Sequence, residues 1–114
     1  MKQEEAILQS ECFKWAWNNF PETRKMLFHI PNGGQRSLRE ASKFKAMGVI
    51  PGVPDMCFIT FGQVYFFEFK SGKGQLSKEQ LEWHHKAKCQ NIEVFIINNF
   101  DVFKNIFEKL CKKY

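Results

Sequence analysis

Apolar and polar positions along the chain follow two different periods, and the switches between them mark out the predicted elements. Apolar residues recur every three or four positions over residues 2–19, 37–48, 77–90 and 101–114, which predicts helices. Short apolar runs predict strands over residues 25–30, 56–61, 64–71 and 93–98. The order α-β-α-β-β-α-β-α predicts an α/β sandwich, in which helices flank a central mixed sheet.

Capping and turn residues sharpen these boundaries. Ser37 with Glu40, and Ser77 with Gln80, have the spacing of capping boxes at helix starts. Either Asn99 or Asp101 is expected to cap the last helix. A two-residue turn at Gly62-Gln63 is expected to join the second and third strands as a hairpin.

The first helix is expected to bury one face. That face is predicted to consist of Ile7, Leu8, Glu11, Cys12, Trp15 and Ala16. Trp15, Trp17 and Trp83 are interpreted as core residues rather than as base-stacking residues, and His29 as a hydrogen-bonded structural histidine.

Composition limits the possible functions. With 114 residues, of which 44% are hydrophobic, the chain is expected to form one domain over residues 1–114. Its net charge of +5 is compatible with a polyanionic partner. Four scattered cysteines without a CxxC pair favour reduced thiols. The acidic N-terminus and the absence of a long apolar run predict a soluble cytoplasmic protein with no membrane partner. No small-molecule cofactor is expected either.

The stretch "VYFFEFKSG" carries the candidate chemistry, because Glu68 interrupts an otherwise apolar strand. A buried carboxylate is costly unless it is paired or binds a metal. With a turn at Gly62-Gln63, Asp55 would face Lys70, and Glu68 would lie diagonally to Asp55 on the same face. Two carboxylates ~4 Å apart repel by about 4 kcal/mol at an effective dielectric near 20. A divalent cation such as Mg²⁺ or Mn²⁺ would offset this repulsion.

An ion pair of Lys70 with Asp55 or Glu68 on a solvated edge is the alternative. The aromatic residues around Glu68 favour a central strand instead, and the rigid "PGVPD" loop fixes the backbone where Asp55 begins. A register slipped by one residue would put the two carboxylates on opposite faces.

The spacing D-x₁₂-E-x-K of Asp55, Glu68 and Lys70 resembles the PD-(D/E)xK nuclease superfamily. The segments "GVIPGVPD", "FFEFK" and "LSKEQLEW", in this order, resemble the virus-type replication-repair nuclease (VRR-Nuc) domain, in its compact stand-alone form from phages and bacteria. The resemblance covers nearly the whole chain. One departure is Asn91, where a glycine is expected, and asparagine also tolerates a left-handed backbone.

The resemblance implies a restriction-endonuclease-like sandwich and a Mg²⁺- or Mn²⁺-dependent endonuclease that hydrolyses DNA, related to Holliday-junction resolvases. The implied metal ligands are Glu11, Asp55, Glu68 and the carbonyl of Phe69. Glu4 or Glu5 could replace Glu11, and the number of metals stays open. The implied catalytic residues are Asp55, Glu68, Lys70 and Gln80. His84 lies four residues after Gln80 and could share its face.

Basic residues around this site are expected to contact DNA phosphates. They are Arg36, Arg39, Lys43, Lys45 and Lys73. Branched DNA and a homodimer are the expected partners, since a junction has two strands to cut and the last helix is apolar nearly all round. A restriction-type or flap-type nuclease and a non-catalytic DNA-binding module are the alternatives.

Overall fold

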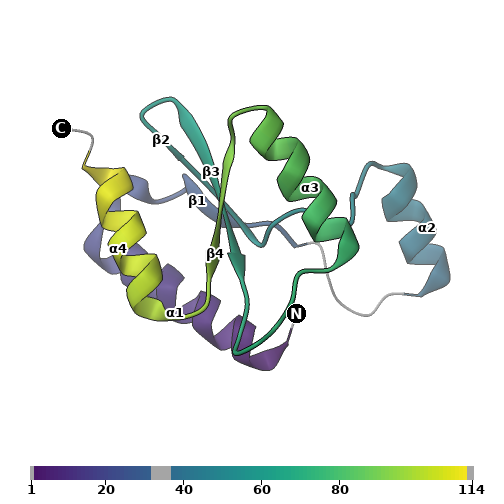
Figure 1. The fold of residues 1–114 in the computed structure, drawn as a ribbon, viewed down its shortest axis with the longest axis horizontal. Helices are drawn as coiled ribbons and strands as arrows, with labels where there is room; N and C mark the ends of the chain where they lie inside the picture. Colours follow the sequence, from purple (N-terminus) through teal and green to yellow (C-terminus); the bar gives the residue numbers. More distant parts are fainter. Residues whose placement is uncertain (1, 32–36, 113–114) are drawn as a thin grey trace.

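The computed structural model describes residues 2–31 and 37–112. Its helices are α1 (Gln3–Asn19), α2 (Leu38–Ala46), α3 (Lys78–Cys89) and α4 (Phe100–Cys111), and a 3-10 turn, η1 (Pro21–Thr23), follows α1. Its strands are β1 (Leu27–His29), β2 (Met56–Thr60), β3 (Gln63–Phe69) and β4 (Glu93–Ile97). The predicted order of helices and strands is therefore confirmed (Figure 1).

The strands form one mixed sheet in the order β1-β2-β3-β4. β1, β2 and β3 pair antiparallel, and β3 pairs parallel with β4. β3 is thus an inner strand, as its apolar sequence predicts, and β1 and β4 are the terminal strands. This arrangement confirms the predicted α/β sandwich with a mixed central sheet.

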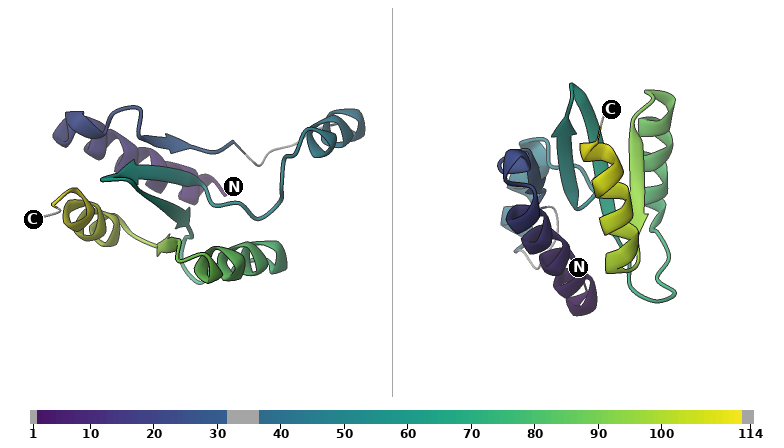
Figure 2. Two further views of the ribbon diagram at one scale, coloured as in Figure 1. Left: turned by 90° about the horizontal axis from the view of Figure 1, so that it is seen from above. Right: turned by 90° about the vertical axis from the view of Figure 1, so that its left-hand side faces the viewer.

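Aromatic side chains fill the layer between the sheet and the helices α1 and α4. Phe58 on β2 and Phe67 on β3 are fully buried against Phe103 and Phe107 of α4. α3 covers the opposite face (Figure 2). There, Trp83 packs edge-on against Phe66. α2 buries no residue and projects from one end of the molecule.

The hairpin register differs from the prediction. The turn consists of Phe61 and Gly62, both with positive φ, at 49° and 73°. A two-residue type I′ turn needs positive φ at both central residues, and such turns match the twist of a hairpin. Cys57 therefore pairs with Phe66 rather than with Glu68. Because the register moved by two positions, every side chain kept its predicted face.

The buried face of α1 agrees with the prediction in part, because Cys12 and Ala16 are buried and Leu8 and Trp15 pack against the core. Its buried residues are Glu5, Cys12 and Ala16, whereas Ile7 is 59% exposed and Glu11 is exposed. The helix is rotated toward Glu5 because α1 packs on both β3 and α4. Trp17 is 42% exposed and is not a core residue, contrary to the interpretation above.

The cap predictions are confirmed for α3 and α4 and in part for α2. Ser77 and Gln80 form a complete capping box, and Asn99 caps α4. At the start of α2, Ser37 accepts a hydrogen bond from the Glu40 amide, which is one of the two bonds of the predicted capping box. Asn91 has a φ of 61°, in the left-handed region. Within residues 2–31 and 37–112, no helix is long and apolar enough to span a bilayer.

Candidate active site

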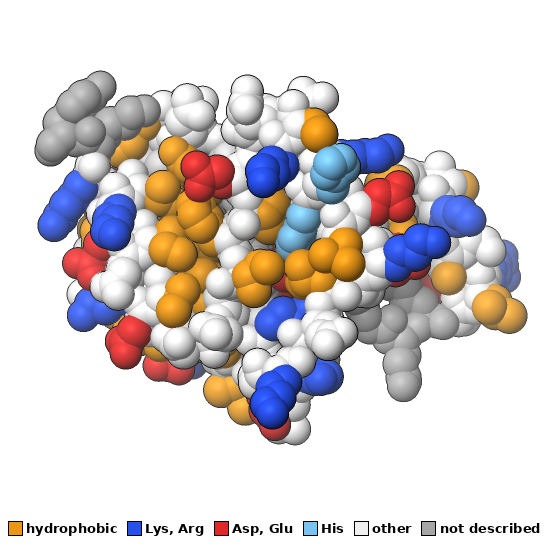
Figure 3. All heavy atoms as spheres, viewed as in Figure 1, with side chains coloured by type: hydrophobic (Ala, Val, Ile, Leu, Met, Phe, Trp, Pro, Cys, Tyr) orange, Lys and Arg blue, Asp and Glu red, His pale blue; other side chains and the backbone are white. Residues whose placement is uncertain are grey.

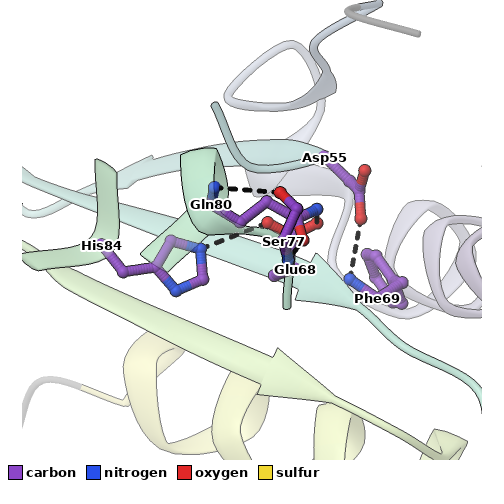
Figure 4. Close-up of polar contacts among 6 residues, drawn as sticks. All are labelled: Asp55, Glu68, Phe69, Ser77, Gln80 and His84. Atoms are coloured by element: carbon purple, nitrogen blue, oxygen red, sulfur yellow. Dashed lines mark hydrogen bonds and ion pairs between the residues drawn. The ribbon is translucent and has the colours of Figure 1, made fainter. Parts of the chain in front are cut away.

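Asp55 and Glu68 lie directly opposite each other on the face of the sheet that α3 covers. β2 begins at Met56, which pairs with Phe67, so the same register extended by one residue puts Asp55 across from Glu68. Asp55 Oδ2 accepts a hydrogen bond of 2.7 Å from the Phe69 amide. That bond takes the place of a backbone partner where Pro54 ends the pairing, and it fixes the orientation of the Asp55 carboxylate (Figure 4).

Glu68 is 1% exposed, and α3 holds both of its carboxyl oxygens. Gln80 Nε2 donates to Glu68 Oε2 at 3.3 Å, and His84 Nε2 lies 3.2 Å from Glu68 Oε1. Gln80 and His84 are four residues apart, so they share one face of α3 and reach down to the same carboxyl group (Figure 4).

The capping box at the start of α3 orients the Gln80 amide. Gln80 Oε1 accepts a hydrogen bond of 2.8 Å from the Ser77 amide, and Ser77 Oγ accepts one of 3.1 Å from the Gln80 amide. The cap therefore fixes the Gln80 amide oxygen, and the NH₂ group of the same amide is directed at Glu68. Gln80 thus takes part in the helix cap and also contacts the buried carboxyl group of Glu68.

Glu68 is in a strongly perturbed environment. Burial is the largest cause, and together with the negative charge of Asp55 and a hydrogen bond to it, it raises the pKa of Glu68 from 4.5 to about 9. The charge of Glu5 acts in the same direction, and Lys70 opposes it. Without a cation, these effects favour the protonated form of Glu68.

The surroundings of His84 favour its neutral form. Burial lowers the pKa of His84 from 6.5, and the positive charge of Lys70 lowers it too, against the effect of Asp55. The pKa shifts of Glu68 and His84 both favour uncharged groups, which suits a hydrogen bond between them.

Glu5 and Lys70 flank the carboxylate pair from the end of β3. Glu5 is 5% exposed, and its Oε2 accepts a 3.2 Å hydrogen bond from the Ser71 amide. Gly74 packs between the two side chains, because a Cβ there would lie 3.7 Å from both Glu5 Oε2 and Lys70 Cδ. Glu5 is therefore the acidic residue of α1 that the structure places beside the pair, the alternative to Glu11 that the sequence left open.

The loop before Asp55 is fixed against the start of α3. Gly52 has a φ of 90°, and a Cβ there would clash with the Glu79 carbonyl and lie 2.9 Å from the Gln80 amide nitrogen. Only glycine fits both the backbone conformation and the close approach. This contact sets the position of the "PGVPD" loop relative to Gln80, and so of Asp55 relative to Glu68.

The other predicted residues lie farther from this cluster or at its rim. Glu11 faces solvent on α1, and the Phe69 ring is buried in the core while its amide holds Asp55. Lys73 is exposed in the loop after β3. The exposed side chains of α2 include Arg39, Lys43 and Lys45, whereas Arg36 lies outside the described residues. Figure 3 shows Lys and Arg side chains scattered over the surface of α2 and α3.

The donor set suits a hard divalent cation. Within the described part of the chain, no three His, Cys, Asp or Glu side chains are grouped closely enough to hold a metal by themselves. Asp55 and Glu68 nevertheless offer carboxylate oxygens, and burial together with the charge of Asp55 raises the pKa of Glu68. A cation in place of the Glu68 proton would satisfy both groups, so the residues fit Mg²⁺ or Mn²⁺.

Sequence reasoning did not assign a role to His84 or settle on Glu5. A signal for both was present. His84 follows Gln80 by one helical turn, and Glu5 precedes the buried Cys12 by two turns on the same face of α1. Their contacts depend on how α3 and α1 pack on β3, which helical spacing does not specify.

Taken together, the fold and the site define an α/β sandwich with two opposed carboxylates and a lysine at the end of an inner strand. A solved structure described as a "VRR_NUC domain protein" is similar to this chain, with a TM-score of 0.76 and 22% sequence identity. The match covers 97% of this chain and 93% of that chain. The fold implied by the sequence resemblance is therefore confirmed. No protein-family model matches the chain, and no curated protein does.

Proposed function

We propose that the protein is a divalent-metal-dependent DNA endonuclease that hydrolyses phosphodiester bonds. One observation carries the proposal. Asp55 and Glu68 face each other beside Lys70 on a fold shared with a VRR_NUC domain protein, and burial with the charge of Asp55 raises the pKa of Glu68. A buried carboxyl in this environment is costly for folding, which favours a function for the pair over a purely structural role.

Asp55 and Glu68 would hold the cation, with the carbonyl of Phe69 as a further oxygen donor. A cation there supplies a Lewis acid and lowers the pKa of a bound water molecule. Lys70 stabilises negative charge that develops on the phosphate in the transition state. Gln80 and His84 keep the Glu68 carboxyl in one orientation, which preserves the site for the substrate.

The finer parts of the proposal concern the substrate and the assembly. We expect branched DNA, such as a four-way junction, to be cut by a homodimer, because two strands related by two-fold symmetry need two copies of the site. The exposed basic residues of α2 (Arg39, Lys43 and Lys45) and Lys73 would contact backbone phosphates.

A cleavage assay tests the function. The wild-type protein and the variants Asp55→Asn, Glu68→Gln and Lys70→Ala are incubated with junction, flap and linear duplex DNA, with Mg²⁺, Mn²⁺ or EDTA. Metal-dependent cleavage by the wild type and its loss in the first two variants are expected. Lys70→Ala should lower the rate much more than the affinity for DNA, because its role is in the transition state.

The outcomes separate the alternatives. Full activity of Asp55→Asn or Glu68→Gln would sink the assignment of the two ligands. DNA binding without cleavage under every metal condition would leave a non-catalytic module. Preferential cutting of flaps or linear duplex would favour the flap-type or restriction-type nuclease over the junction-selective one.

A further inference from the structure

A groove runs between α1 and the terminal strand β1, on the side of the sheet away from α3. It encloses about 470 Å³. Phe13, Trp17 and Phe28 are among the residues that line it, and Trp17 is 42% exposed. The volume lies in the range of pockets that hold small ligands or single groups of a larger one.

One end of this α1–β1 groove adjoins the candidate active site. His29 lines the groove, and its Nδ1 lies 2.9 Å from the carbonyl oxygen of Asp55. Because a carbonyl can only accept, Nδ1 carries the proton, and Nε2 is left as an acceptor when the ring is neutral. The contact places this end of the groove at the β1 edge of the sheet, beside the backbone of Asp55, whose carboxylate lies on the opposite face.

The charge of the groove favours an anion. Its described lining contains Lys14 and Lys25 and no carboxylate. Beside it, the Arg24 guanidinium lies 4.8 Å from the centre of the Trp17 ring, and its Nε donates to the Trp17 carbonyl at 3.0 Å. Cations are thus held next to an exposed aromatic ring.

We propose that the α1–β1 groove binds a short single-stranded segment of the nucleic-acid substrate, which passes the β1 edge of the sheet beside Asp55. This rests on the proposed nuclease function. A base stacks on Trp17, and the phosphates contact Lys14 and Lys25, the combination that single-strand binding proteins use.

Binding of a short fluorescein-labelled oligothymidylate, followed by fluorescence anisotropy in EDTA at several NaCl concentrations, tests the inference. The groove variant combines Lys14→Gln with Lys25→Asn. Asparagine suits position 25 because Lys25 has a φ of 76°, which asparagine tolerates well, so the fold should persist. The matched control combines Lys86→Gln with Lys88→Gln, which removes the same charge from exposed positions on α3.

The groove variant should bind the oligothymidylate more weakly, and its affinity should depend less steeply on the NaCl concentration. Each phosphate contact contributes about 0.7 to the slope of log K against log [salt], so the slope should become shallower by roughly 1.4. The control should keep the wild-type slope. Trp17→Leu should also weaken binding, and Trp17→Phe should restore most of it, since an aromatic ring stacks and leucine does not.

Three outcomes would overturn the inference. They are equal weakening by the groove and control variants, no weakening by the groove variant, and a groove variant that sediments as a smaller species than the wild type. A smaller sedimenting species would mean that the α1–β1 groove makes contacts between copies of the chain. Failure of the nuclease proposal is separate, since it would show as absent cleavage while the oligothymidylate still bound through the groove.

Discussion

The position of Glu68 in the fold disfavours the ionised form of its carboxyl group, which is the form that would bind a metal. Nothing next to it in sequence is unusual for an inner strand. Its high pKa arises because Asp55 lies opposite, α3 lies above, and water is excluded. Gln80 and His84 satisfy the protonated form, and a cation would satisfy the ionised form.

The metal-free protein should therefore lose stability as the pH rises. Below about pH 4.5, Glu68 is protonated in both the folded and the unfolded chain. Between pH 4.5 and about 9, the unfolded chain releases this proton and the folded protein keeps it, so stability falls as pH increases. In EDTA, the Glu68→Gln variant should not lose stability in this way. The difference between its Tm and that of the wild type should therefore increase from pH 5 to pH 9.

Glu82→Gln is the control, because Glu82 is exposed on α3. Its Tm difference from wild type should show no such rise. A Tm difference for Glu68→Gln that stayed constant over this pH range would mean that Glu68 is ionised in the folded, metal-free protein.

His84 provides a test of how the carboxyl is positioned. His84→Ala removes the group at Glu68 Oε1, and loss of such a supporting contact to a metal ligand typically lowers activity by about 10- to 100-fold. His84→Gln places an amide near the position of Nε2 and should recover most of that loss. The measurement is the cleavage rate at saturating DNA with Mn²⁺.

His85→Ala is the matched control, since His85 is exposed and its Nε2 lies 3.8 Å from the Cys89 sulfur, away from Glu68. If His85→Ala lowered the rate as much as His84→Ala, the effect would lie in the stability of α3 and not in the orientation of Glu68. A rate for His84→Gln as low as that of His84→Ala would point to a proton transfer that needs imidazole.

The elements around the site depend on two glycines that act in different ways. Gly52 lets the "PGVPD" loop touch the backbone of α3, and Gly62 completes the hairpin turn that sets the register of β2 and β3. Both have positive φ, but a side chain at Gly62 would meet nothing within 4 Å.

Alanine substitutions at Gly52 and Gly62 should separate the cost of a left-handed backbone from the effect of displacing the loop that carries Asp55. Gly62→Ala should cost about 1–2 kcal/mol in the free energy of unfolding, the price of a left-handed alanine. Gly52→Ala adds a backbone clash, so it should cost more and also lower the cleavage rate of the protein that remains folded. Urea unfolding and cleavage assays measure both. Equal losses of stability with unchanged cleavage would show that the contact with α3 does not position Asp55.

Local signals in the sequence predicted most of these elements and the faces of the strands. Ser77 and Gln80 predicted the start of α3, and the period of two put Asp55, Glu68 and Lys70 on one face. The register was wrong because Phe61 is an unusual residue for positive φ, so a turn beginning at glycine was the better guess from sequence. The rotation of α1 and the contact of His84 could not be predicted, because they arise from packing between distant segments.

Within residues 2–31 and 37–112, no strand pairs with the outer edge of the sheet at β4. β4 is a terminal strand, and Ile96 is 46% exposed on it. On the other side of β4, Val102, Ile106 and Leu110 of α4 are only partly buried, while Phe103 and Phe107 fill the core. Figure 3 shows hydrophobic side chains gathered over α4 and toward α3. A free strand edge between apolar side chains is a surface that soluble proteins usually cover.

A second copy of the chain is the occupant that the proposed function requires, so the protein should sediment as a dimer at micromolar concentration without DNA. Ile96→Glu should give a monomer, because it would place a charge in the centre of the interface. Val64→Glu makes the same change at a 39% exposed position on β3 and should leave the dimer intact. The monomeric variant should nick junction DNA on one strand at a time, whereas the dimer cuts both strands together. A wild-type protein that is strictly monomeric and cuts only unbranched DNA would exclude the resolvase-like function and leave a monomeric nicking nuclease.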